Sequence, residues 1–244
     1  LVPGISGTNF AAVAHKVYGE ESITVVWAAP GDPKATVQRF HPSGASSIAA
    51  ATVGTTAYPD HLDVVATSAG GILVGWDTGG TTGDVFVAYL GADLTLDAGS
   101  PVLVGEPATG LQRMGQLATL SDGTVMATWD DSMADSTSFG VRARHLAAKG
   151  APIAAGFRVN VLQIGDQAAP QLAVLPGDDF VVSFIDSFGT GWTRRLAANG
   201  DPRSGIPERR ANTTTKGDQT ELQVAAAPSG AVLATWQSPV PLKD

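Results

Sequence analysis

One pattern recurs five times along the chain and constrains its fold more than any other feature. Each copy has an apolar strand, a tight turn that contains glycine, and a second apolar strand that ends in an aromatic residue. The terminal aromatics are 49, 53, 55 and 52 residues apart. So even an interval indicates one structural unit repeated in tandem. The terminal aromatics are Trp27, Trp76, Trp129, Phe184 and Trp236.

Each copy is typical of a β-hairpin. The turn Ser121-Asp122-Gly123 contains residues that accept positive φ, and Pro228-Ser229-Gly230 adds a proline that presets the turn. The flanking runs are nearly continuous in apolar character, which is typical of strands covered on both faces. A polar loop and two further strands follow in most copies, as in residues 140–146 and 156–161. Pro and Gly interrupt every stretch long enough to form a helix.

Four antiparallel strands in about 50 residues are the content of one propeller blade. We therefore predict an all-β chain that forms a five-bladed β-propeller of four-stranded antiparallel blades. The last blade is expected to be closed by, or shared with, the N-terminal strand at residues 1–6. The chain is then a single repeat domain over residues 1–244. Its units span about 7–57, 58–110, 111–165, 166–217, and 218–244 together with 1–6.

The composition excludes several classes of function. The 23 acidic residues outnumber the 15 basic ones and leave a net charge of −8, so we expect no nucleic-acid partner. The absence of cysteine excludes disulfides, thiolate metal sites and cysteine nucleophiles. No apolar run is long enough for a membrane span. The first ten residues lack the pattern of a signal peptide. We expect a processed protein, or part of a longer chain or assembly.

Short motifs in the repeats resemble a known type of sequence. The elements that carry the resemblance are Gly165-Asp166-Gln167, Pro170, Phe180-Val181-Val182, Arg195-Leu196 and Val159-Asn160, with Arg39-Phe40, Ser121-Asp122-Gly123 and Gly217-Asp218-Gln219 elsewhere. They are similar to the Trp/Asp-Gly β-repeats of large secreted bacterial proteins, including RTX-type adhesins. The first two units lack the Gly-Asp-Gln entry. The resemblance implies a propeller-like module in an extracellular or cell-surface setting, and it implies no activity.

The repeating aromatics allow two interpretations. We expect them to fill the wedge between neighbouring sheets, where each contributes buried apolar area. The alternative is a ring of exposed platforms on which sugars stack. Trp192 lies off the repeating position, after Gly189-Thr190-Gly191, and is the better candidate for an exposed aromatic that contacts a ligand.

Aspartates gather in loops that a propeller places on one rim. Hard oxygen ligands in loops are what Ca²⁺ requires, and Asp130, Asp131 and Asp135 lie closest together in the sequence. They are candidate calcium ligands, and solvated turn residues are the alternative. The predicted rim set is Asp32, Asp60, Asp77, Asp84, Asp130, Asp131, Asp135, Asp166, Asp186 and Asp218.

A second group of rim residues could contact a ligand. His61 stands beside Asp60 in a linker and could serve in acid–base chemistry. The candidate ligand-binding residues are Trp192, Asp60, His61, Asp166 and Asp218. A glycosidase would need two facing carboxylates, and Glu106 and Glu208 are isolated from one another. The sequence therefore nominates no catalytic residue.

We therefore expect a non-enzymatic binding or scaffold module of a secreted or cell-surface protein. It would contact carbohydrate or protein through its loop rim. One alternative is a purely structural repeat segment of a larger extracellular assembly. The other is a glycoside hydrolase-like propeller.

Overall fold

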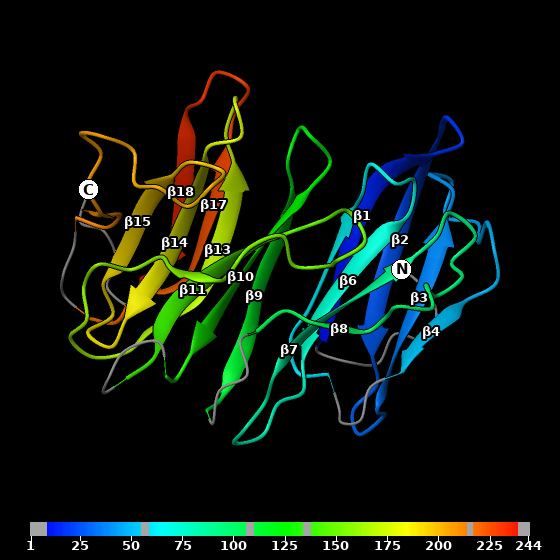
Figure 1. The fold of residues 1–244 in the computed structure, drawn as a ribbon, viewed down its shortest axis with the longest axis horizontal. Coiled ribbons are helices and arrows are strands. Elements are labelled where there is room, and N and C mark those ends of the chain that lie inside the picture. The colour runs from blue at the N-terminus through cyan, green and yellow to red at the C-terminus, as the bar shows by residue number, and fades with distance from the viewer. Residues whose placement is uncertain (1–8, 55–58, 106–109, 134–137, 214–216, 239–244) are drawn as a thin grey trace.

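The regular elements are all β-strands in the computed structural model, which describes residues 9–54, 59–105, 110–133, 138–213 and 217–238. Within these ranges no helix is long and apolar enough to cross a membrane. The strands form five antiparallel sheets that follow one another in chain order, from blue at the right of Figure 1 to red at the left.

Four of the five sheets have four strands, and the fifth has two in the described part of the chain. The first contains β1 (Asn9–Val17), β2 (Glu20–Ala28), β3 (Lys34–Phe40) and β4 (Ala51–Gly54). The second contains β5 (Leu62–Ala66), β6 (Ile72–Asp77), β7 (Val85–Leu90) and β8 (Val102–Leu103). The third contains β9 (Gln112–Thr119), β10 (Val125–Asp131), β11 (Gly140–Leu146) and β12 (Phe157–Arg158). The fourth contains β13 (Gln167–Val174), β14 (Phe180–Asp186), β15 (Gly191–Leu196) and β16 (Arg209–Arg210), and the fifth β17 (Thr220–Ala226) and β18 (Val232–Gln237).

Each sheet is a meander whose neighbouring strands are consecutive in the chain. The first strands of the sheets pack against one another in series, β1 on β5, β5 on β9, β9 on β13 and β13 on β17. This radial arrangement is that of a β-propeller and confirms the predicted fold class. Residues 1–6 lie outside the described residues. The expected joining of residues 1–6 to the last unit, and the unit boundaries, therefore stay predictions.

Glycine closes the hairpins where the sequence predicted turns. Gly123 has φ of +82° and donates its N–H to the carbonyl oxygen of Leu120 at 3.0 Å. Gly230 repeats this geometry in the fifth sheet, with φ of +83° and a 2.8 Å bond to Ala227. A side chain at either position would be strained, because this left-handed region suits glycine.

The core lies between neighbouring sheets. Trp76 packs in the cluster between the first and second sheets, Trp129 between the second and third, and Phe184 between the third and fourth. All three are fully buried, which confirms that they fill the wedges and excludes them as exposed sugar platforms. Trp27 and Trp236, in the first and fifth sheets, are only half-buried.

Candidate functional site

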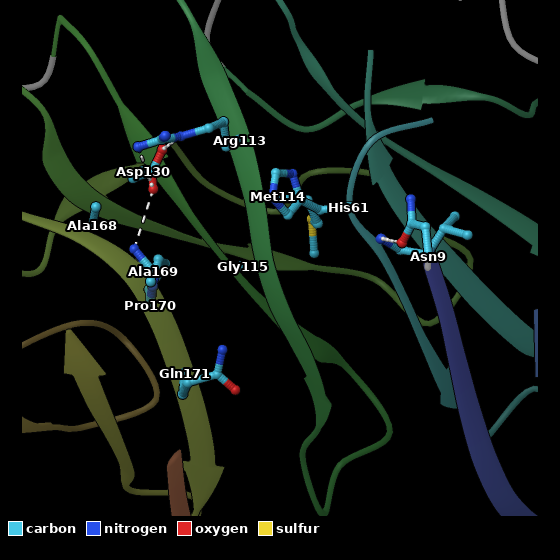
Figure 2. Close-up of a pocket in the computed structure, with 11 residues that line it drawn as sticks. Asn9, His61, Arg113, Met114, Gly115, Asp130, Ala168, Ala169, Pro170 and Gln171 are labelled. Carbon is cyan, nitrogen blue, oxygen red and sulfur yellow. Dashed lines mark hydrogen bonds and ion pairs between the residues drawn. The ribbon is translucent and has the colours of Figure 1, made fainter. Parts of the chain in front are cut away.

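A cavity of about 340 Å³ opens where the first strands of four sheets meet. Asn9 begins β1, His61 directly precedes β5, Arg113 and Gly115 belong to β9, and Pro170 belongs to β13 (Figure 2). Four sheets therefore contribute to one cavity at the axis of the propeller. This is where a propeller gathers side chains from distant parts of its sequence.

Two aspartates reach the axis from equivalent positions in adjacent sheets. Asp77 directly follows the repeating Trp76, and Asp130 directly follows Trp129. Each accepts a hydrogen bond from the first strand of the next sheet. The N–H of Met114 donates to Asp77 Oδ2 at 2.8 Å, and that of Ala169 donates to Asp130 Oδ2 at 3.2 Å. The two carboxylates thus tie the sheets together around the cavity.

Each aspartate also has a basic partner on its own first strand or at the start of it. His61 Nδ1 lies 2.7 Å from Asp77 Oδ2. Arg113 holds Asp130 with two hydrogen bonds, from Nε to Oδ1 at 2.7 Å and from Nη2 to Oδ2 at 3.1 Å. Figure 2 shows Asp130 between Arg113 and Ala169, with His61 farther toward Asn9. The site is therefore built from two matching base–acid pairs.

The His61–Asp77 pair orients an imidazole toward the cavity. The side chain of His61 is 50% exposed, whereas that of Asp77 is fully buried. The hydrogen bond to Asp77 raises the pKa of His61, and burial opposes this only in part. With Nδ1 donating to Asp77, Nε2 is the nitrogen available to a bound molecule. This pair can therefore deliver or accept a proton.

The Arg113–Asp130 pair places a buried carboxylate on the same cavity. Burial raises the pKa of Asp130, and the hydrogen bonds and charge of Arg113 oppose that shift. A buried carboxylate with a bidentate arginine partner is held in one orientation. Asp130 can therefore act as a fixed negative charge or as a base.

Asp60 adds a third carboxylate beside His61. Its carboxylate oxygen and the ligand atoms of His61 and Asp77 all lie within 4.8 Å of one another. Asp60 is exposed and Asp77 is buried. The three side chains could hold a cation as well as shape the charge around the imidazole. Of the five candidate ligand-binding residues named from the sequence, Asp60 and His61 therefore lie next to the axial cavity.

The remaining predicted ligand residues lie elsewhere. The carboxylate of Asp166 accepts the N–H of Phe139 at 3.1 Å, and Asp218 is an exposed residue packed against Gly189. Trp192 is half-buried rather than exposed, and its Nε1 donates to Asp186 Oδ2 at 2.8 Å. The structure does not bring these three residues to the axial cavity.

The three candidate calcium ligands are not seen as one group. Asp130 is engaged by Arg113, and Asp131 accepts hydrogen bonds from Gln112 Nε2 at 3.3 Å and from the N–H of Met133 at 2.8 Å. Successive residues of a strand point to opposite faces, so these two carboxylates diverge. Asp135 lies outside the described residues. Calcium binding there stays a prediction.

Sequence reasoning missed Arg113 and did not single out Asp77. The signal was present in the repeat: an acid directly after the terminal tryptophan, with a basic residue where the first strand begins. The fourth sheet carries Ile185 after Phe184, so it offers no third pair at this position.

The fold has counterparts among solved structures, although no family model and no curated protein matches the sequence. An α-L-arabinanase of Penicillium chrysogenum complexed with arabinobiose gives a TM-score of 0.63 at 11% identity, covering 93% of this chain and 74% of that chain. A mutant α-L-arabinofuranosidase of Fusarium graminearum, in complex with an iminosugar inhibitor, gives 0.64 at 13% identity with the same coverages. The chain is a β-propeller. The hydrazine synthase of Kuenenia stuttgartiensis matches at 0.60 and 12% identity, covering 89% of this chain and 68% of that one, so the shared fold serves unrelated chemistry.

These findings correct one prediction. The expected non-enzymatic binding or scaffold module was wrong, because the matching structures include several arabinanases and arabinofuranosidases. The axial cavity agrees with this correction, since it presents acid–base side chains that such a module does not need. The findings favour the glycoside hydrolase-like propeller that the sequence left as an alternative.

Proposed function

We propose that this propeller is a glycoside hydrolase that cleaves arabinose-containing glycans in its axial cavity. The observation that carries the proposal is the convergence of His61, held by Asp77, and Asp130, held by Arg113, on one cavity. Matching structures named as arabinanases and arabinofuranosidases, two of them with arabinobiose bound, support the substrate class.

His61 is the proposed general acid, in the place of the second carboxylate that most glycosidases use. Hydrolysis breaks the bond between the anomeric carbon and the glycosidic oxygen, and that oxygen needs a proton as it leaves. The raised pKa of His61 keeps its imidazole protonated in mildly acidic solution. Asp77 holds Nδ1, so the proton on Nε2 is the one that is transferred.

Asp130 is the proposed general base. Its carboxylate takes a proton from water as the water oxygen bonds to the anomeric carbon. Arg113 and the N–H of Ala169 fix its orientation, and the charge of Arg113 favours the ionised form that a base requires. Proton donor and proton acceptor are thereby separate groups in one cavity.

The test is turnover of 4-nitrophenyl α-L-arabinofuranoside and of arabino-oligosaccharides by the purified chain. We expect His61→Gln and Asp130→Asn to lower kcat by about 10²-fold or more each, as for loss of an acid or base. The rate should fall as pH rises through the pKa of His61, above its ordinary value of 6.5. Asp77→Asn should move that alkaline limb to lower pH, because it removes the charge that favours the imidazolium.

His145→Gln is the matched control, since His145 lies on β11 and bonds Thr124 away from the cavity. It should retain full activity. Absence of turnover by the folded wild-type chain, or equal losses in the His61 and His145 variants, would contradict the proposal.

The cellular setting is also a proposal. The resemblance of Gly165-Asp166-Gln167 and related motifs to repeats of large secreted bacterial proteins supports an extracellular or cell-surface location. Immunodetection in cell, surface and medium fractions of the native host tests it. A purely intracellular signal would contradict it.

A further inference from the structure

One buried arginine lacks the partner that other arginines of this chain have. Arg39, on β3, is only 4% exposed, and it donates from Nη1 to the carbonyl oxygen of Ala92. Its Nε and Nη2 are buried and have no hydrogen-bond partner. These two nitrogens form one edge of the guanidinium, the edge that binds a carboxylate with two parallel hydrogen bonds.

The same edge is occupied in three other arginines. Arg113 places Nε and Nη2 on Asp130, and Arg195 places them on Asp179 Oδ2 at 3.0 and 2.8 Å. Arg203 directs both nitrogens to Asp179 Oδ1. Arg39 therefore departs from a pattern that this molecule uses repeatedly.

The repeat explains why the partner is missing. Ile23 pairs with Phe40 in the first sheet as Phe180 pairs with Leu196 in the fourth. Arg39 and Arg195, each one residue earlier, therefore occupy equivalent positions. The residue that precedes Phe180 is Asp179, whereas the one that precedes Ile23 is Ser22. A neutral hydroxyl stands where the fourth sheet supplies a carboxylate.

Space for an external carboxylate exists beside Arg39. A cavity of about 250 Å³ is lined by Arg39, Ser22 and Ser47, together with the exposed residues Tyr18 and His41. Ser47 Oγ is a second buried polar atom without a partner. Buried guanidinium N–H groups and a buried hydroxyl that lack hydrogen-bond partners are both costly, so a ligand that bonds to them forms hydrogen bonds that folding left unmade.

The charges around the cavity select the kind of anion. The carboxylates of Glu20 and Asp93 also line it. These carboxylates would repel a phosphate dianion, which carries two negative charges, more strongly than a carboxylate, which carries one. A planar carboxylate also matches the two nitrogens of Arg39 geometrically.

We propose that this cavity binds a small monocarboxylate, such as an acidic monosaccharide, through Nε and Nη2 of Arg39 with Ser47 as a further contact. The cavity lies at the hairpin end of β1, whereas Asn9 and the axial cavity lie at the other end. Nine residues of strand separate the two by about 26 Å. The carboxylate site therefore does not depend on the proposed hydrolase activity.

The experiment is calorimetric titration of the full chain with D-glucuronate, with D-glucose as the neutral counterpart and with inorganic phosphate. We expect saturable binding of glucuronate and none of glucose, with phosphate at least tenfold weaker. Arg39→Gln should abolish binding. Ser22→Asp should supply the internal carboxylate found in the fourth sheet, and should weaken glucuronate binding at least tenfold while raising Tm.

Arg195→Gln is the matched control, because it removes the equivalent arginine whose edge Asp179 already occupies. It should leave glucuronate binding unchanged. The proposal is overturned if the wild-type chain binds no glucuronate, if Ser22→Asp folds and binds it as the wild type does, or if phosphate binds as tightly.

Discussion

The third and fifth sheets contain nearly the same hairpin in different surroundings. The third ends its second strand in Met-Ala-Thr-Trp and the fifth in Leu-Ala-Thr-Trp. Yet every residue of β10 is buried, including Trp129 at 0% exposure, whereas β18 is exposed or half-buried along its length. In both hairpins the two strands pair antiparallel and are joined by a turn that contains glycine. The difference therefore comes from neighbours and not from the hairpin.

The third and fifth sheets differ in how much of their surface neighbouring sheets cover. The third sheet lies between two sheets, with apolar clusters on both sides. Among the described residues, the fifth shares a small cluster with the fourth, made by Ala173, Leu175 and Val181 with Val224 and Ala226. A repeat unit thus brings its own turn and strands, but its stability comes from packing against the next unit.

The largest expected effect comes from truncating the repeated aromatic in each of these two sheets. Trp129→Ala should lower the free energy of unfolding by about 3–5 kcal/mol, as for a fully buried large side chain. Trp236→Ala should cost about 1 kcal/mol, because that side chain is only partly buried. Urea unfolding of both variants measures the two losses. Equal losses would break the comparison.

A partly buried acid in the second sheet extends the comparison with the fifth sheet to charge. Burial raises the pKa of Asp63, on β5, from 3.8 to about 6, although its carboxylate accepts the N–H of Leu117 at 2.6 Å. The folded state therefore binds the proton more tightly than the unfolded chain, so stability falls as pH rises from about 4 to about 6. Asp63→Asn should remove this loss and raise stability at pH 7 by about 1–2 kcal/mol.

Thermal unfolding of Asp63→Asn at pH 4 and pH 7 tests this, with Glu221→Gln on the exposed fifth sheet as the matched control. The control should change Tm by less than a degree at either pH. A gain at pH 4 as large as that at pH 7 would show that the effect is not the charge of Asp63.

The smallest expected change in stability comes from Asp179 in the fourth sheet, whose equivalent in the first sheet is Ser22. Hydrogen bonds from Arg203 and then Arg195 lower the pKa of Asp179. This stabilisation is present above the ordinary pKa of 3.8 and is lost as pH falls through the lower value in the folded state. Asp179→Asn should cost about 1 kcal/mol at pH 7, since both arginines are partly exposed and screened, and less at pH 2.

Denaturant titrations at the two pH values give this difference. The first sheet, with Ser22 at the equivalent position, supplies the reference, because Ser22→Asn should have no pH-dependent effect. A loss at pH 2 equal to that at pH 7 would assign the cost of Asp179→Asn to packing.

The hairpins could be predicted from the sequence because their determinants are local. Gly123 sets a turn, and the nearly continuous apolar runs on either side of it set the strands. The burial of Trp129 also followed from its place in the repeat. The same reasoning could not separate Trp129 from Trp236, because burial depends on contacts between units.

The axial pairs were harder to predict because a backbone N–H of the next repeat completes each of them. His61 and Asp77 are 16 residues apart, but Asp77 is completed by the N–H of Met114, 37 residues further on. A rim of aspartates could be expected from loop positions. The arginine that engages one of them has a signal only when two repeats are aligned, because Arg113 and His61 both stand near the start of a first strand.

The shape of the axial cavity depends on the lack of a side chain at Gly115. A Cβ at Gly115 would lie 2.6 Å from Pro170 Cγ and 2.9 Å from two carbonyl oxygens, those of Pro170 and Thr128. The glycine therefore lets the third sheet pack closely against the fourth where both line the cavity. A larger residue at this position would have to displace Pro170 or the backbone of β10, so the spacing of the two sheets and the shape of the cavity would change together.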